Sequence, residues 1–367
     1  MPEPAILRDA AVEHGPAKRD PNSKVQHIDA CLGDAVEYHK TTGFERFDFV
    51  NNALPETSLK HLDISTRFLG KQLQAPLMIA PMTGGTERGA AINQVLARAA
   101  ERWQIPMGVG SQRLAVEDGS RARHYALRQH APTTMLFANF GGAQLARGWG
   151  AKEAHRAVDM LNADALFVHL NPIQEAIQGG DQDFRGLHVR LQRLCASLAS
   201  DRLPVLAREV CFGMSRDTCT RLQDCGVAGI DCAGAGGTSW AKVEALCARH
   251  PRRRIMGERF GEWGIPTSES VINARAACPT LPLIATGGIR DGIDLAKALA
   301  LGADLGAMAR PFLLKAHEGE AALDAFIEQT LDELRICMFG VGAKNLNGLR
   351  GMLQATAAAN AESVGVT

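Results

Sequence analysis

Four polar side chains crowd into seven residues near the middle of the chain, in the stretch His169-Leu170-Asn171-Pro172-Ile173-Gln174-Glu175. Glu175 and the amide oxygen of Gln174 are hard oxygen ligands of the kind that Mg²⁺ accepts, usually together with substrate phosphates. The imidazole of His169 can add a hydrogen bond to the same phosphates. The spacing therefore indicates a site for a Mg²⁺-bound diphosphate. The alternative is a core histidine followed by an ordinary helix start.

A second candidate site lies near the end of the chain, in Ile284-Ala285-Thr286-Gly287-Gly288-Ile289-Arg290-Asp291-Gly292, with a further apolar run at 305–309. The pattern predicts a buried strand, a glycine turn, a helix and a second short strand. Gly287 and Gly288 let backbone N–H groups approach an anion, the helix N-terminus adds its positive end, and Arg290 can add paired donors. This order predicts a phosphate clamp. The alternative is a plain strand-turn-helix whose glycines serve only sterics.

Both stretches belong to a repeating pattern that starts at residue 76. Short apolar runs alternate with helical stretches, which predicts a parallel sheet closed as an α/β fold, the (β/α)8 TIM barrel. The eight runs are 77–81, 107–109, 135–140, 165–170, 205–210, 229–233, 283–285 and 305–309. A helix at about 27–40 would place Lys24 and His27 on one face. The interval 238–281 predicts an enlarged loop and helix after the sixth strand, and 324–340 a closing helix.

Polar residues gather where the predicted strands end, which is where a barrel of this type carries its catalytic groups. Besides the two stretches above, they are Met82-Thr83-Gly84-Gly85, Gly110-Ser111-Gln112-Arg113, Asn139, Arg208-Glu209-Val210 and Gly234-Ala235-Gly236-Gly237-Thr238-Ser239-Trp240. This set suits FMN, whose phosphate would lie on Gly287, Gly288 and Arg290. The cation of Arg208 would lie near the pyrimidine edge of the isoalloxazine and stabilise anionic reduced flavin.

Composition limits the kinds of partner. The 367 residues include 40 Lys plus Arg and 40 Asp plus Glu, so no global field attracts nucleic acid or an anionic membrane, and a small-molecule ligand is expected. The nine cysteines have no CxxC pair and are expected to be reduced core thiols. With no signal core and no run of 18 apolar residues, we expect a cytoplasmic protein. We expect a flexible segment at 1–21, one barrel domain at 22–353 and a tail at 354–367.

These motifs resemble, in order and over about residues 22–350, the FMN-dependent type 2 isopentenyl diphosphate isomerases, and the stretch 169–175 is the most specific part of the resemblance. The resemblance implies a Mg²⁺-requiring interconversion of isopentenyl and dimethylallyl diphosphate, with NADPH or NADH as flavin reductant, in a homo-oligomer that is a tetramer or octamer. It assigns FMN contacts to Met82, Thr83, Gly84, Ser111, Asn139, Arg208, Thr238, Gly287, Gly288, Arg290 and Ala309. It assigns the metal to Gln174 and Glu175, and the substrate to Lys24, His27, Arg113, His169 and Asn171.

Two positions depart from the family pattern, and three other readings compete with it. The family usually has Arg before the residue that is Lys24 here, whereas this chain has Ser23. The family has Lys at the position of Arg208, and Arg carries the same charge as Lys in a different shape. An FMN-dependent 2-hydroxy acid oxidase would need a His that residues 231–238 lack. A nucleotide-type dehydrogenase would need a catalytic Cys on a loop, whereas Cys232 falls in a predicted strand. The third alternative is a flavin-binding paralogue without isomerase activity.

The predicted chemistry has no net redox change. Gln174 and Glu175 are assigned to the metal, and no other acid and base pair is placed for an alkene, so reduced flavin itself is expected to donate and accept the proton. Protonating a double bond creates positive charge, which an anionic reduced flavin would stabilise while Arg208 keeps that flavin anionic.

Overall fold

The computed structural model describes residues 23–356 of the chain, and eight parallel strands at its centre close into a barrel. Neighbouring strands follow one another in sequence order around the barrel, and the last strand pairs with the first, β11 with β4. Their bounds are β4 Leu77–Ile79, β5 Met107–Gly108, β6 Leu136–Gly141, β7 Ala165–Leu170, β8 Val205–Glu209, β9 Gly229–Asp231, β10 Leu283–Thr286 and β11 Leu305–Met308. All eight predicted runs are therefore barrel strands, and the predicted fold class is confirmed.

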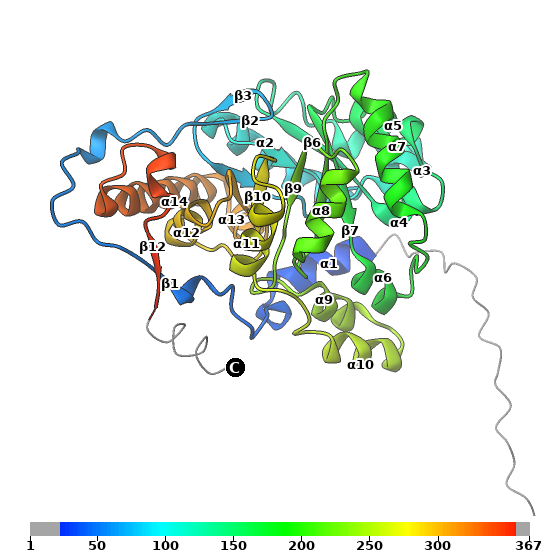
Figure 1. Cartoon of the computed structure of the whole chain (residues 1–367). Coiled ribbons are helices and arrows are strands. Elements are labelled where there is room, and N and C mark those ends of the chain that lie inside the picture. Colours follow the sequence, from blue (N-terminus) through cyan, green and yellow to red (C-terminus); the bar gives the residue numbers. More distant parts are fainter. Residues whose placement is uncertain (1–22, 357–367) are drawn as a thin grey trace, which may run out of the picture.

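Helices connect the strands and surround the barrel (Figure 1). They are α2 Glu87–Trp103, α3 Arg113–Glu117, α4 Gly142–Ala146, α5 Ala151–Asp159, α6 Pro172–Gln178, α7 Leu187–Ala199, α8 Arg216–Asp224, α9 Trp240–Cys247, α10 Pro251–Arg259, α11 Thr267–Ala277, α12 Gly292–Ala300, α13 Arg310–Glu318 and α14 Glu320–Val341. Short 3-10 helices are η1 Asp34–Val36, η2 Phe44–Arg46, η3 Leu59–His61, η4 Gly119–Tyr125 and η5 Leu346–Leu349. The predicted closing helix is α14, which is longer than the expected 324–340.

The chain before the barrel differs from the prediction. Helix α1 spans Ser23–Leu32, so it starts and ends earlier than the expected 27–40, and Gly33 with η1 ends it. Lys24 and His27 both lie within α1, as their spacing indicated. Helix α1 packs on α9 and α13 rather than standing free in solvent. The predicted flexible segment 1–21 lies outside the described residues.

Two small antiparallel ribbons flank the barrel. Strands β2 (Thr66–Phe68) and β3 (Lys71–Leu73) form one, and β1 (Phe47–Phe49) pairs with β12 (Leu353–Ala355) to form the other. Gln354 and Ala355, the first two residues of the expected tail 354–367, belong to β12 and pair with Asp48 and Phe47. The remainder of that tail, 357–367, lies outside the described residues.

The segment after the sixth strand is more structured than an enlarged loop and one helix. It contains three helices, α9, α10 and α11, and α10 packs against α9. Pro251 begins α10, where a missing N–H costs nothing, and the Ser239 side chain caps the first turn of α9 by accepting from Lys242 N. This insertion places α9 beside α1 at the carboxyl ends of the strands.

The apolar core has two main layers. One fills the barrel interior with side chains that include Met78, Phe137, Phe167, Leu206 and Ile284. The other lies between the barrel and its helices. All nine cysteines lie in the described part of the chain and are free thiols, most of them buried, as predicted. Among the described helices, none is long and apolar enough to cross a membrane.

Candidate active site

A cavity of about 440 Å³ opens at the carboxyl ends of the barrel strands, and every residue proposed from the sequence lines it. Such a volume is typical of small-molecule and cofactor sites. The lining includes Lys24, His27, Met82, Thr83, Gly84, Ser111, Arg113, Asn139, His169, Asn171, Gln174, Glu175, Arg208, Thr238, Gly287, Gly288, Arg290 and Ala309. The structure thus brings together residues that lie far apart in the sequence. Their individual roles stay predictions.

Helix α1 forms one wall of the cavity. Lys24 Nζ donates to the carbonyl oxygens of Gly84 (3.0 Å) and Ser111 (2.7 Å), which lie in the loops after β4 and β5. His27 has a side chain only 16% exposed and stands edge-on to Trp240 of α9, with ring centroids 5.4 Å apart. Lys24 and His27 therefore both lie in the cavity wall.

The ring of His169 is oriented by Asn139 from the neighbouring strand. Asn139 Nδ2 donates to Val109 O at 2.9 Å, so its Oδ1 is turned toward His169 Nδ1, also at 2.9 Å. Because an amide oxygen can only accept, His169 must carry a proton on Nδ1. In a neutral imidazole this assignment leaves Nε2 as the hydrogen-bond acceptor. His169 lies at a strand end that faces the cavity, which disfavours the core-histidine reading.

The predicted metal residues belong to a buried polar network that includes a carboxylate the sequence reasoning missed. Asn171 Nδ2 donates to Gln174 Oε1 (3.0 Å) and Glu175 Oε1 (3.2 Å), which brings these two oxygens together. Gln174 Nε2 donates to Glu244 Oε1 at 2.7 Å, and Glu244 is 5% exposed. His27 Nε2 lies 3.5 Å from the same Glu244 oxygen. Glu244 therefore joins α1, α6 and α9.

The oxygen atoms of this network suit a cation that also binds substrate. Within residues 23–356 there is no group of three or more His, Cys, Asp or Glu side chains able to hold a metal alone. Mg²⁺ commonly takes only one or two protein carboxylates and completes its shell with water and phosphate oxygens. In the same described range, Asn171 Oδ1 and Gln178 Oε1 are buried acceptors without a hydrogen-bond partner, and both residues line the cavity. Buried acceptors of this kind are expected where a donor or cation binds.

Arg208 at the end of β8 is held beneath the cavity by a second carboxylate. Its side chain is 5% exposed, its Nε lies 3.4 Å from Asp231 Oδ2, and its Nη1 donates to Pro81 O at 3.3 Å. Burial raises the pKa of Asp231, and the guanidinium of Arg208 opposes that rise. Asp231 ends β9 and is fully buried. The pair fixes where the charge of Arg208 lies.

The glycines at the ends of β9 and β10 serve close packing of two loops. A Cβ on Gly237 would clash with Gly288 N, and one on Gly287 would clash with Gly234 O. Gly287 and Gly288 have φ angles of +104° and +73°, which L side chains rarely adopt. The loops thus meet backbone to backbone beside Thr238 at the cavity wall. Steric need accounts for the glycines, and the same exposed backbone can serve an anion.

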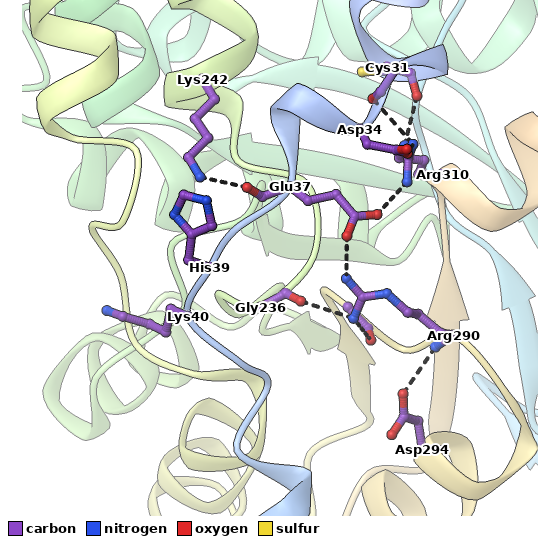
Figure 2. Close-up of polar contacts among 12 residues, drawn as sticks. Cys31, Asp34, Glu37, His39, Lys40, Gly236, Lys242, Arg290, Asp294 and Arg310 are labelled. Atoms are coloured by element: carbon purple, nitrogen blue, oxygen red, sulfur yellow. Dashed lines mark hydrogen bonds and ion pairs between the residues drawn. The ribbon is translucent and has the colours of Figure 1, made fainter.

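Arg290 lies at the edge of the cavity and contacts both glycine loops. Its Nη1 is 3.2 Å from Gly236 O and 3.3 Å from Gly288 O (Figure 2). Its backbone N–H donates to Asp294, and the Asp291 side chain caps α12 by accepting from Asp294 N at 2.8 Å. The predicted order of strand, glycine turn, helix and strand is therefore confirmed at β10, α12 and β11.

Sequence reasoning missed Glu244 and Asp231 for different reasons. Asp231 stands at the end of β9, and a lone buried carboxylate there has no motif that marks it. Glu244 lies on α9, four residues after Trp240, and this one-turn spacing indicates that the two side chains share a face of the helix. What the sequence could not supply is the contact of α9 with α6 and α1, which turns Glu244 toward Gln174.

Comparison with known proteins places the chain in a family. The family of FMN-dependent dehydrogenases matches residues 17–135 and 119–355. Isopentenyl-diphosphate delta-isomerase of Xanthobacter autotrophicus is 50% identical over 336 residues, which cover 91% of this chain and 97% of that protein. The isomerase of Nostoc sp. is 48% identical over 335 residues, or 90% and 95% of the two chains. That of Mycolicibacterium gilvum is 42% identical over 337 residues, or 91% and 96%.

Solved structures show the same fold at much lower identity. A mutant flavocytochrome b2 with benzoylformate superposes with a TM-score of 0.64 at 17% identity, covering 93% of this chain and 85% of that one. A putative lactate oxidase of Pediococcus acidilactici gives a TM-score of 0.59, also at 17% identity, covering 90% and 89%. At 17% identity these structures show the shared fold alone. The isomerases above match about nine-tenths of the chain at 42–50% identity. The chain therefore belongs to the FMN-dependent, or type 2, isopentenyl-diphosphate delta-isomerases.

Proposed function

We propose that this enzyme interconverts isopentenyl and dimethylallyl diphosphate with bound FMN and Mg²⁺, without net redox change, after NADPH or NADH has reduced the flavin. One observation carries the proposal. A single cavity combines glycine loops and an arginine suited to a flavin phosphate with a buried network, Asn171, Gln174 and Glu175, suited to a Mg²⁺-bound diphosphate. An enzyme that used flavin alone would not need the second half of this cavity.

The residue types that line the cavity suit both ends of FMN. Thr238, Gly287, Gly288, Arg290 and Ala309 would hold the phosphate end, where the loops already bring backbone groups close together. Met82, Thr83, Gly84, Ser111 and Asn139 would hold the ring system from the loops after β4, β5 and β6. Reduced FMN, once bound, would supply the proton donor and acceptor for the alkene. Arg208 would hold a negative charge at the pyrimidine edge, because Asp231 fixes its guanidinium beneath the cavity.

The remaining polar residues would bind and orient the substrate diphosphate. Glu175 and Gln174 would hold Mg²⁺ through their oxygens, with the other positions filled by phosphate and water. The hydrogen bond from Gln174 Nε2 to Glu244 supports this role, because it keeps the Gln174 oxygen turned toward Asn171 and Glu175. His169 would hydrogen-bond a phosphate oxygen once protonated on Nε2. Lys24 of α1 and Arg113 of α3 would add positive charge, and His27 of α1 would add a hydrogen bond beside Glu244.

The proposal also includes an assembly and a compartment. Nine free thiols suit a reducing compartment, so we place the protein in the cytoplasm. A homo-oligomer, either a tetramer or an octamer, follows from the family resemblance. Size-exclusion chromatography with light scattering measures it directly, and a monomer at micromolar concentration would contradict this part.

The test of the proposed function is an anaerobic assay with purified protein, isopentenyl diphosphate, FMN, Mg²⁺ and NADPH, followed by phosphorus and proton NMR of the product. Dimethylallyl diphosphate should form with the wild-type protein. The His169→Ala variant is the matched control, and it should bind FMN but turn over much more slowly. A wild-type protein that binds FMN and Mg²⁺ and forms no dimethylallyl diphosphate would contradict the proposal.

A further inference from the structure

The carboxylate of Glu37 bridges two arginines at the phosphate end of the cavity (Figure 2). Its Oε2 lies 3.1 Å from Arg290 Nη2, and its Oε1 pairs with Arg310 Nη1. All three residues line the cavity, and the Glu37 side chain is 33% exposed. Each carboxylate oxygen therefore serves a different guanidinium, and one side chain links the loop after β10 to the start of α13.

Arg310 ties this bridge to the end of α1. It is the first residue of α13, and its side chain is 11% exposed. It donates to the carbonyl oxygens of Cys31 (2.8 Å) and Gly33 (3.2 Å), and it pairs with Asp34 (2.6 Å). A cation at the C-terminus of a helix satisfies carbonyls that have no partner within the helix. Arg310 thus fixes α1, which carries Lys24 and His27, against the barrel.

The backbone around Glu37 is paired with the loop after β9. Glu37 forms an isolated antiparallel bridge with Thr238, and Tyr38 N donates to Gly237 O at 2.9 Å. Ser239 N donates to Val36 O at 2.8 Å, which completes a short ladder. Lys242 Nζ donates to Glu37 O at 2.6 Å. Glu37 therefore lies over both glycine loops, holding one through its backbone and the other through Arg290.

We propose that Glu37 is a positioning residue for the flavin phosphate: it fixes Arg290, Arg310 and the loop of Thr238 in one arrangement before the phosphate binds. The inference rests on FMN binding at this end of the cavity, which is part of the proposed function. It assigns a binding role to a residue of the N-terminal segment, outside the barrel strands and their loops. Because Arg310 also holds the end of α1, Glu37 links the helix that carries Lys24 and His27 to the phosphate site.

Two opposite electrostatic effects decide the sign of the Glu37→Gln change. A carboxylate next to a phosphate repels it, so its loss alone would tighten FMN binding. The same loss leaves Arg290 and Arg310 as like charges without the carboxylate between them. Arg310 keeps its bonds to the end of α1, whereas the half-exposed Arg290 turns more readily toward solvent. The Glu37 side chain is one-third exposed, so solvent screens the direct repulsion. The positional effect depends on geometry and is screened less, so weaker FMN binding is expected.

The experiment compares FMN with riboflavin, which lacks the phosphate, by flavin fluorescence quenching on apoprotein. Glu37→Gln should raise the Kd for FMN by about three- to tenfold, the range expected for loss of one partly exposed charge-assisted contact. The Kd for riboflavin should not change. Asp34→Asn is the matched control, because Asp34 pairs with the same Arg310 but is 95% exposed. It should leave both affinities unchanged.

Each outcome bears on the inference separately from the proposed function. Equal FMN affinity in Glu37→Gln and wild type, or tighter binding in the variant, would overturn the positioning role. Equal loss for FMN and riboflavin would also overturn it, since a general disturbance of the cavity does not distinguish the two ligands. If Glu37→Gln does not fold, Glu37→Asp, too short to reach both arginines, should show the same FMN-specific loss. A wild-type protein that binds no FMN would instead refute the proposed function.

Discussion

Removing the charge of Arg208 tests the buried pair that fixes it beneath the cavity. Arg208→Met keeps much of the side-chain volume but leaves Asp231 as a fully buried carboxylate without its guanidinium. Leaving one member of a buried ion pair alone costs about 3–5 kcal/mol at neutral pH. Burial already raises the pKa of Asp231, and only Arg208 among the charged groups acting on it opposes that rise. The variant should therefore raise this pKa further.

The sign of the pH dependence follows from that rise. In the variant, the folded state keeps a proton on Asp231 at pH values where the unfolded chain has lost it. Stability is then fully present below the unfolded pKa of about 3.9 and falls by about 1.4 kcal/mol per pH unit until the folded pKa is reached. The destabilisation by Arg208→Met should accordingly be smaller near pH 5 than near pH 8.

Urea unfolding at pH 5 and pH 8 measures this dependence. The proteins to compare are wild type, Arg208→Met, Asp231→Asn and the double variant. The double variant should be more stable than Arg208→Met at pH 8, because no unpaired charge remains. A destabilisation that is equal at the two pH values and is not relieved by Asp231→Asn would refute the reasoning. In that case Arg208 would stabilise through packing on Phe167, whose ring centroid lies 5.6 Å away.

Three further predictions concern the phosphate, the metal and the N-terminal segment. Arg290→Ala should weaken FMN binding by about 1 kcal/mol, which is low for a charge-assisted contact because the Arg290 side chain is 46% exposed. A fluorescence titration that gives wild-type FMN affinity would contradict the phosphate clamp. Glu175→Gln should raise the Mg²⁺ concentration needed for half-maximal isomerisation and leave FMN affinity unchanged. An unaltered Mg²⁺ dependence would instead assign Glu175 a structural role, such as accepting a hydrogen bond from Asp181 N. Burial raises the pKa of Glu262, but bonds from Lys242 and from the N–H groups of Lys40 and His39 outweigh it and lower that pKa to about 2. The stability that Glu262 contributes is then present above about pH 4.5 and lost as pH falls toward 2, so thermal midpoints of Glu262→Gln and wild type should differ at pH 7 and converge near pH 2.

The barrel could be predicted from the sequence because its signals are local. Each strand is a short apolar run followed by glycine or polar residues, and all eight runs were found. Strand ends point to the same side of a parallel barrel, so the site residues from Met82 to Ala309 could be placed on one cavity without knowing any contact. Only the family resemblance predicts that Lys24 and His27 reach the cavity, because the barrel pattern does not fix the position of a helix that precedes it.

What could not be predicted depends on contacts between distant segments. The end of α1 at Leu32 is fixed by Arg310, which lies 279 positions after Cys31 and donates to its carbonyl. The pairing of β12 with β1 joins the last described strand to a segment that precedes the barrel, and neither strand has a pattern long enough to predict it. Glu244 and Glu37 carry no motif, and their importance comes from what α9 and the segment 33–40 are packed against.

The proposed reaction moves a double bond without consuming electrons. An anaerobic assay with prereduced FMN, Mg²⁺ and isopentenyl diphosphate, but without NADPH, tests this by counting product molecules per flavin. A reaction without net redox change should give many turnovers per flavin, with the flavin still reduced at the end. Turnover that stops after about one product per flavin would mean that electrons are consumed, and the protein would then be an oxidoreductase.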